Sequence, residues 1–223
     1  MSIKKIFIMI SLSILTVNAA TSASAKVTAT TERKHQFTET ANNQSVTVEW
    51  VEKINSGIPE YTRKTNSETE ISRGKSHTTF WELKNSDKTL SISIEDDTAL
   101  ITTSENGQTT SKSQPLFDIP LTYPPSFYLS KFAKSNKRKI TVWVVNKSEN
   151  ELRKMIFTKL KNEEITIKNT TQNALKIEMK PPGFAGVVWK AYYWVHPTTG
   201  EFIKYFGKKG PPGTPDFTII KSK

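Results

Sequence analysis

Apolar and polar residues alternate with a period of two along much of this chain, and no other feature constrains its fold as strongly. In residues 46–50, valine and tryptophan alternate with threonine and glutamate, and residues 90–94 and 175–179 show the same pattern. Successive side chains of a β-strand point to opposite faces, so these runs predict strands with one apolar and one polar face. We therefore expect a mostly β protein whose sheet covers a core on one side.

Turn-forming residues recur between these runs at hairpin spacing. Asn106-Gly107 is the strongest signal, because both residues tolerate the positive φ of a two-residue hairpin turn. We also expect a turn at Asp96-Asp97 and a hairpin tip at Glu163-Glu164. Many strands with this spacing predict a curved antiparallel meander, as a barrel, a sandwich or, in our favoured form, a half-barrel or clam. Such a one-sided sheet must close on itself, wrap a helix or hold a ligand.

One region breaks the alternation and predicts a short helix. Pro124-Pro125 can open a helix, and residues 126–135 follow with helical spacing. The basic run 134–139 suits the end of that helix. The side chains expected to pack in or on the concave face of the sheet are Phe127, Tyr128, Leu129 and Phe132.

Two further runs are predicted to lie at the centre of the sheet. Residues 140–145, ITVWVV, are apolar on both faces and indicate a strand buried on two sides. Residues 186–213 carry two aromatic runs around a Pro-Thr-Thr-Gly turn and indicate a hairpin. Because residues 187–195 are apolar on both faces, we interpret this hairpin as central and fold-defining.

The N-terminus has the pattern of a secretory signal peptide. Two lysines precede an apolar run at residues 6–17, and Ala23-Ser24-Ala25 matches a cleavage site. The apolar run is shorter than the ~20 residues of a membrane-spanning helix, which disfavours an anchor. We expect residues 1–25 to be removed after Ala25, leaving a single β domain, residues 26–223, that is periplasmic or secreted.

The amino-acid composition indicates in which compartment the protein acts and which kinds of partner it can bind. The chain has no cysteine, which excludes disulfides, thiol nucleophiles and zinc–thiolate sites and fits a bacterial periplasmic protein. Its formal net charge is +11, spread widely, so the lysines either keep the surface solvated or contact an anionic membrane surface. The densest basic clusters are residues 134–139, which contain the basic patch Lys137, Arg138 and Lys139, and residues 204–209. A nucleic-acid partner is not expected for a protein exported to this compartment.

No residue pattern predicts catalysis or a cofactor. His35, His77 and His196 are far apart and lack metal-binding spacing, so no metal site is predicted. The chain has no nucleophile elbow, phosphate loop or calcium loop. Adjacent carboxylates in a strand face opposite ways and cannot form a catalytic pair locally. We expect a protein that is not an enzyme.

Aromatic residues suggest a binding site. Tryptophan rings in predicted strands usually form core, but they also line apolar ligand pockets, for which β-barrel mouths are common places. The residues proposed to contact a ligand are Trp50, Trp81, Trp143, Phe127 and Phe132. The predicted function is binding of a hydrophobic or amphiphilic molecule, such as a lipid, in the concave face. The alternative is an envelope structural or protein-interaction module that uses an edge strand or the basic patch. We expect a monomer.

The C-terminal hairpin carries a family resemblance. Trp189, Tyr193-Trp194, Thr199-Gly200-Glu201, Lys204-Tyr205 and Gly207 resemble the last hairpin of a family of uncharacterised exported bacterial β-proteins. His196 stands where that family often has aspartate. The resemblance implies a curved antiparallel sheet around a short helix, similar in outline to periplasmic lipoprotein-carrier half-barrels. It implies no enzyme activity and no established ligand.

Overall fold

The computed structural model describes residues 31–208 and 214–222, where fourteen strands form one antiparallel sheet. The predicted signal peptide lies outside the described residues. The first meander contains β1 (Thr31–Ala41), β2 (Gln44–Asn55), β3 (Ile58–Lys64), β4 (Glu68–Arg73), β5 (Phe80–Asn85), β6 (Lys88–Glu95), β7 (Thr98–Glu105) and β8 (Gln108–Pro115). The second contains β9 (Lys139–Asn146), β10 (Glu151–Ile167), β11 (Thr170–Lys180), β12 (Ala191–Val195), β13 (Phe202–Lys208) and β14 (Asp216–Lys221). The helices in this part are α1 (Pro125–Lys134) and α2 (Ala185–Val188).

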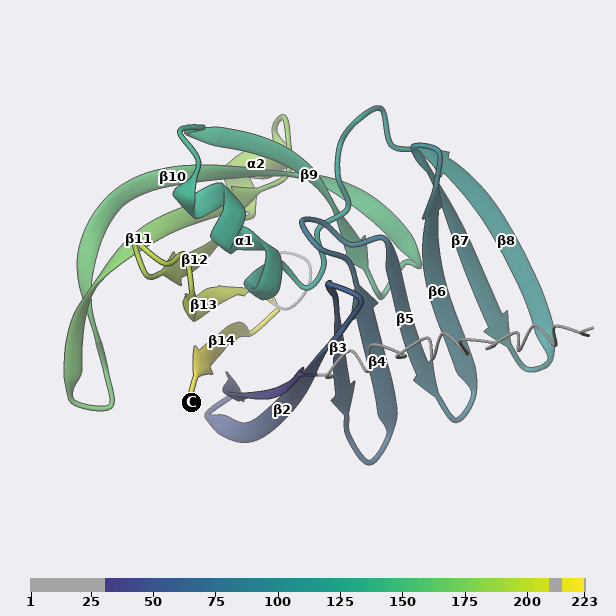
Figure 1. Ribbon diagram of the computed structural model, residues 1–223, viewed down its shortest axis with the longest axis horizontal. Coiled ribbons are helices and arrows are strands. Elements are labelled where there is room, and N and C mark those ends of the chain that lie inside the picture. The colour runs from purple at the N-terminus through teal and green to yellow at the C-terminus, as the bar shows by residue number, and fades with distance from the viewer. Residues whose placement is uncertain (1–30, 209–213, 223) are drawn as a thin grey trace, which may run out of the picture.

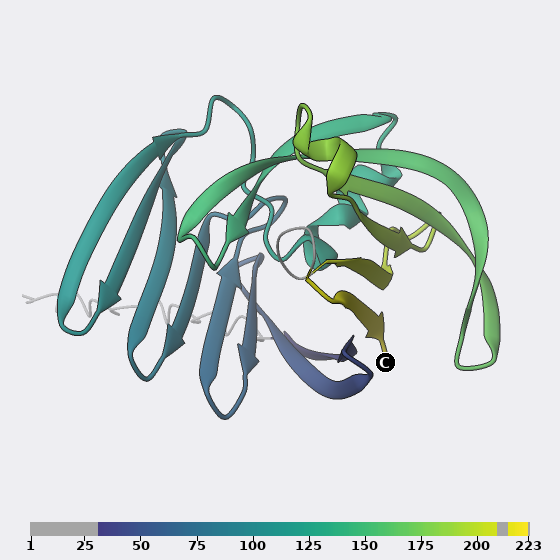
Figure 2. The same ribbon diagram turned by 180° about the vertical axis from the view of Figure 1, so that it is seen from behind.

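The two meanders meet where β1 pairs with β14, from Phe37 opposite Lys221 to Ala41 opposite Phe217. The chain runs strand by strand from β1 to the edge strand β8, then crosses the concave face through α1. It resumes at the opposite edge with β9 and returns to β14. Figure 1 shows this sheet curving around α1, and Figure 2 shows it from behind. The sheet does not close into a barrel, so the predicted curved meander with one short helix in its concave face is confirmed.

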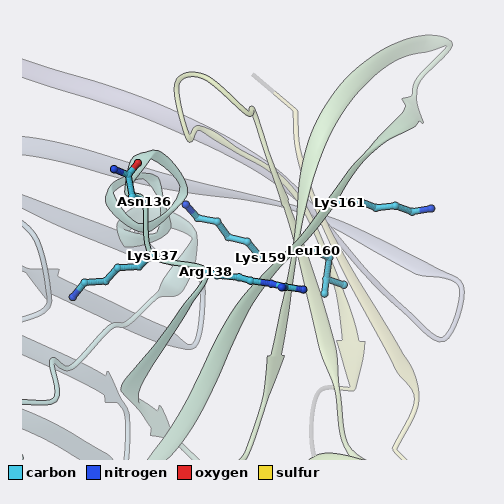
Figure 3. Close-up of a pocket in the computed structure, with 6 residues that line it drawn as sticks. All are labelled: Asn136, Lys137, Arg138, Lys159, Leu160 and Lys161. Carbon is cyan, nitrogen blue, oxygen red and sulfur yellow. The ribbon is translucent and has the colours of Figure 1, made fainter.

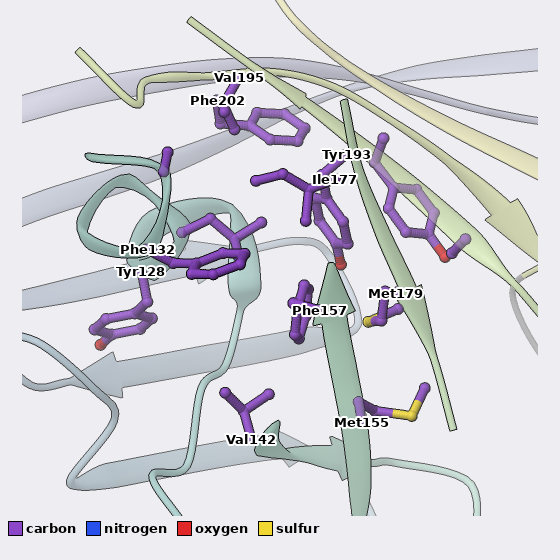
Figure 4. Close-up of a cluster of buried hydrophobic side chains, with 14 of the residues drawn as sticks. Tyr128, Phe132, Val142, Met155, Phe157, Ile177, Met179, Tyr193, Val195 and Phe202 are labelled. Atoms are coloured by element: carbon purple, nitrogen blue, oxygen red, sulfur yellow. The ribbon is translucent and has the colours of Figure 1, made fainter. Parts of the chain in front are cut away.

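Helix α1 fills the more strongly curved half of the sheet. Its Tyr128, Leu129 and Phe132 are buried, as predicted. They join inward-facing residues such as Phe157 of β10 and Ile177 of β11 in one large apolar cluster (Figure 4). Successive side chains of a strand point to opposite faces, so each strand contributes a residue to the concave face at every second position. Helix α1 packs on the apolar face that results.

A second apolar cluster lies against the flatter half. Trp81, Leu90 and Ile92 from β5 and β6 pack with Val145 and Leu152 from β9 and β10. Residues from opposite ends of the sheet therefore share one core. This packing brings the two halves of the open sheet together in a clam-shaped arrangement.

The prediction of a central strand at residues 140–145 is wrong, because β9 is an edge strand. Its outer edge is covered by the segment before α1. The Trp143 N–H donates to the Pro120 carbonyl at 2.9 Å, and the Thr122 N–H donates to the Trp143 carbonyl at 2.8 Å. The Trp143 indole also donates to the Leu116 carbonyl at 3.1 Å. β9 is apolar on both faces because Ile140, Val142 and Val144 pack in the cluster around α1, whereas Trp143 and Val145 pack in the second apolar cluster.

The structure confirms two of the predicted turns and contradicts one predicted hairpin tip and one predicted strand start. Asn106-Gly107 and Asp96-Asp97 form turns with positive φ, as expected. Glu163-Glu164 is not a hairpin tip, because β10 continues and turns at Lys168-Asn169. Val187 and Val188 do not belong to the central hairpin. They are exposed residues of α2, and β12 begins only at Ala191.

Neither helix in residues 31–208 and 214–222 has the length and hydrophobicity needed to cross a membrane.

Candidate functional site

The five aromatic residues predicted to contact a ligand are divided between the two core clusters. Trp50 and Phe132 are buried in the cluster around α1, and Phe127 packs against that cluster. Trp81 is buried in the second cluster, with Trp143 packed against it. None of the five lines the two hollows described below. All five therefore contribute to the core here, and their contact with a ligand stays a prediction.

Phe127 holds α1 against the first three strands. Its ring stacks on Tyr61 of β3 with centroids 4.0 Å apart and meets Trp50 of β2 edge-on at 5.4 Å. His35 of β1 also meets it edge-on at 5.5 Å, and His35 Nε2 lies 3.1 Å from the buried Glu52 carboxylate. Aromatic pairs in such stacked and edge-on arrangements stabilise the fold by more than the burial of their surface area alone. The concave face is therefore filled by the protein's own side chains at this point.

A buried ion pair crosses the concave face, and the sequence reasoning missed it. Glu70 of β4 accepts hydrogen bonds from the Lys147 ammonium at 2.8 Å and the Trp81 indole at 2.9 Å. Lys147 lies just beyond β9 and also stands 5.4 Å from the Tyr123 ring centroid. Burial opposes the charge on Lys147, but Tyr123 and Glu70 together raise its pKa above the usual value. The pair ties the β9 edge to β4.

A hollow lined mainly by basic residues lies where the α1–β9 connection meets β10. It measures about 610 Å³ and is lined by Asn136, Lys137, Arg138, Lys159, Leu160 and Lys161. Two members of the predicted basic patch, Lys137 and Arg138, line it, whereas Lys139 begins β9 outside the lining. We call these six residues the basic hollow (Figure 3). Four basic residues from two segments that are distant in sequence border it, and their charged ends point in different directions.

A bulge in β10 supplies the second wall of the basic hollow. The register with β11 shifts between Lys159 and Asn162, so two residues of β10 oppose one residue of β11. Such a bulge redirects the side chains of the bulged strand. It leaves Leu160 and Lys161 exposed, beside Arg138. The interrupted alternation at residues 159–162, KLKN, was the sequence signal for this wall.

Lys159 connects the basic hollow to the apolar core. Its ammonium donates to the Ser135 carbonyl at the end of α1 and lies 5.1 Å from the centre of the Phe132 ring. Figure 3 shows the side chain reaching from β10 toward the helix. Burial lowers the pKa of Lys159. A cation, the last turn of α1 and a buried aromatic ring therefore meet at one point on the rim.

The charge around the basic hollow is one-sided. Residues 119–148 contain six lysine or arginine residues and no aspartate or glutamate. Of these cations and the neighbouring Lys159 and Lys161, Lys147 pairs with Glu70, and Lys161 lies near Glu163, whose pKa it helps to lower. An arrangement of this kind attracts anionic groups.

The histidines are dispersed, and within the described ranges no three potential metal-ligating side chains cluster. His35 pairs with Glu52, and His77 Nδ1 lies 3.1 Å from the Ser76 hydroxyl. His196 Nδ1 accepts hydrogen bonds from two backbone N–H groups in the β12–β13 turn. Each ring has a local structural partner.

The two sheet edges differ in how they are exposed. β9 is bonded to residues 120–122, whereas β8 pairs only with β7 in the described part of the chain. β8 carries mostly Thr, Ser and Gln, and its Lys112 lies opposite Ile101, on the core side of the sheet. An inward-pointing charge on an edge strand disfavours pairing with a further strand. A second hollow, at the β1–β2 turn and the start of β14, is smaller, at about 310 Å³, and contains one charged residue, Asp216.

Comparisons with known proteins identify the fold alone. No family model and no curated protein matches the chain. A crystal structure of a beta-barrel-like protein of domain of unknown function DUF1849 from Brucella abortus is similar over 86% of this chain and 95% of that chain. Its TM-score is 0.52 at 8% sequence identity. The expected resemblance to uncharacterised β-proteins is thereby confirmed as a likeness of fold.

Two further solved structures align over most of the chain at low scores. A LolA superfamily protein from Nitrosomonas europaea aligns over 87% of this chain and 84% of its own, with 8% identity and a TM-score of 0.26. An outer membrane lipoprotein-sorting protein domain from Vibrio parahaemolyticus aligns over 86% and 83%, with 10% identity and a TM-score of 0.23. At these scores they support no conclusion about this chain.

Proposed function

We propose that the protein acts in the bacterial envelope by binding an anionic amphiphile at the rim of its concave face. The basic hollow takes the anionic group, and the apolar part lies against the core beside α1. The observation that carries this assignment is the position of Lys159, which contacts both the end of α1 and the Phe132 ring. A ligand with one charged end and one apolar end matches that junction.

The anionic group is selected by charge and geometry. Lys137 and Arg138 come from one segment, and Lys159 and Lys161 from another, so the cations flank an open space. Arginine and lysine bind phosphate and carboxylate through charge-assisted hydrogen bonds. A lipid headgroup or a fatty-acid carboxylate supplies such a group.

The apolar part requires space that the packed core does not leave open. Helix α1 is the element that can yield, because it lies inside the sheet between two connecting segments and its N-terminus has no side-chain cap. A shift of α1 would expose Phe132 and its neighbours next to the basic hollow. We therefore expect ligand binding to move α1 relative to β10.

Mass spectrometry of organic extracts of the purified protein tests for a bound amphiphile directly. Added dodecyl phosphate is expected to raise the melting temperature, whereas dodecyl maltoside, which has no charge, is expected to raise it less. Lys137→Glu/Arg138→Glu is expected to weaken dodecyl phosphate binding by about tenfold or more, on the scale of a lost charge-assisted contact. Lys64→Glu/Lys84→Glu changes the net charge equally on exposed strand positions and should leave binding intact.

Equal loss in both charge-reversed variants would show that net charge alone attracts the probe. That result, or the absence of copurified lipid together with no thermal shift, overturns the proposal. Capture of an envelope protein that is lost in Lys137→Glu/Arg138→Glu, with no bound lipid, would favour the interaction module instead.

A further inference from the structure

The connection between β11 and β12 exposes an apolar surface. Phe184 is 81% exposed, Val187 68% and Val188 59%, all within five residues. We call residues 181–189 the apolar tip. Single exposed apolar residues are ordinary, but a contiguous exposed group marks a contact with another apolar surface.

The backbone of the apolar tip is ordered in a way that keeps these side chains outside. Gly183 takes a positive φ of 69°, which favours glycine. The Gly186 N–H donates to the Gly183 carbonyl at 3.2 Å, and the Val187 N–H donates to the Phe184 carbonyl at 2.9 Å. A Cβ on Gly186 would lie 2.4 Å from the Pro181 carbonyl oxygen, so the turn is tight. The exposed side chains are therefore presented by a defined turn.

Charge around the apolar tip is complementary to an anionic surface. No acidic residue occurs from Met179 to Gly200, and Lys180 and Lys190 flank the tip. Both lysines approach a single carboxylate, that of Glu178, at 3.1 and 3.8 Å. Two cations sharing one anion leave the base of the tip positive. Apolar residues with lysines at their base are typical of segments that lie in a membrane interface.

The apolar tip and the basic hollow lie on the same side of the molecule. Figures 1 and 2 both show the α1–β9 connection and the α2 segment at the upper rim. Their bases are also close along β10, where Ile156 pairs with Lys180 and Lys159 pairs with Ile177. Three residues of a strand span about 10 Å. Lys180 points to the convex face and Lys159 to the concave face, so a surface that meets both must lie along the rim itself.

We propose that this rim docks onto an anionic lipid bilayer. Phe184, Val187 and Val188 enter the interface, while Lys180, Lys190 and the basic hollow lie at headgroup level. Burial of the three side chains supplies a short-range attraction, and the cations supply a long-range one that depends on anionic lipid. This docking shares the basic hollow with the proposed function but requires no bound amphiphile.

Sedimentation with vesicles of phosphatidylcholine, with or without phosphatidylglycerol, tests the docking. The wild-type chain is expected to bind the vesicles that contain phosphatidylglycerol and to bind the neutral ones far less. Phe184→Ser/Val187→Ser/Val188→Ser should weaken binding by about tenfold or more, given the apolar area withdrawn from the bilayer. Val46→Ser/Leu100→Ser replaces exposed apolar residues on β2 and β7 and should bind as the wild type does.

Thermal unfolding without lipid shows whether each variant is folded. If the folded tip variant binds vesicles as well as the wild type, or if the β2 and β7 control loses binding equally, the docking surface is refuted. Binding of monomeric dodecyl phosphate separates the two proposals, because the tip variant should keep it. Loss of vesicle binding with retained dodecyl phosphate binding supports the docking. Vesicle binding without any dodecyl phosphate binding supports the docking and overturns the proposed function alone.

Discussion

Replacing Lys147 by methionine is predicted to destabilise the fold more than replacing its partner Glu70 by glutamine. Glu70 is 2% exposed, so Lys147→Met leaves a buried carboxylate with the Trp81 indole as its remaining donor. Removing one member of a buried ion pair costs about 3–5 kcal/mol. The Lys147 side chain is 32% exposed, so some water reaches the vacated position. We therefore expect the lower end of that range, about 3 kcal/mol.

Glu70→Gln should cost less. Glutamine keeps an acceptor for the Trp81 indole, and the ammonium of Lys147 that it leaves unpaired is partly solvated. A cost of about 1–2 kcal/mol is expected, in the lower part of the range for a buried polar group that loses its hydrogen bond. The double variant Glu70→Gln/Lys147→Met removes both charges. It should be more stable than Lys147→Met alone by about 1 kcal/mol, because no buried charge then lacks a partner.

Urea unfolding of the wild type, the two single variants and the double variant measures this coupling. For a domain of this size each kcal/mol corresponds to about 2–4 °C, so Lys147→Met should melt about 6–12 °C lower. If the double variant loses the sum of the two single losses, Glu70 and Lys147 are energetically independent and the reasoning is refuted.

Three further predictions concern the packing of α1 and the titration of Tyr123. Gly200 has a φ of 70°, and a Cβ there would lie 2.6 Å from Ser130 Cα of α1, so Gly200→Ala should cost about 2–4 kcal/mol in urea unfolding. Gly57→Ala, with a φ of 78° and no atom within 4 Å, isolates the backbone strain and should cost about 1 kcal/mol. Phe127→Ala should lower stability by about 2–3 kcal/mol, because the ring is only partly buried; a thermal midpoint equal to that of the wild type would contradict its role in holding α1. Burial raises the pKa of Tyr123 to about 12. The folded chain then keeps a proton that the unfolded chain releases near its ordinary value of about 10, so stability should fall between about pH 10 and 12, by up to about 1.4 kcal/mol per pH unit. Tyr123→Phe should reduce that slope in urea unfolding at pH values of about 8 and 11, and an unchanged slope would contradict the assignment.

Local patterns predicted the elements of this fold well. The alternating runs became strands, Asn106-Gly107 became a tight turn, and Pro124-Pro125 opened α1. These features depend on neighbours in the chain, namely side-chain period, allowed φ and the missing proline donor. The basic patch was also visible, because Lys137 and Arg138 are adjacent in sequence.

The candidate site was predictable only in part. The second wall of the basic hollow, Lys159 and Lys161, reaches Arg138 through a bulge whose register depends on pairing with β11. The apolar tip resembled a strand because its residues suit either environment, and only packing leaves Val187 outside. The hydrophobicity of a residue does not show whether another part of the folded chain will bury its side chain.

A β-rich fold with one short helix follows from local properties of the chain, namely the period of two and the proline-led helical segment. Which polar residues face inward depends instead on contacts between distant strands. In β4, Glu70 and Ser72 point to the core while Ile71 faces away, against the expected alternation. That inversion is stable because the Trp81 indole and Lys147 arrive from other strands to meet Glu70. A buried charge is tolerated only where distant partners satisfy it, and those partners are brought together by folding.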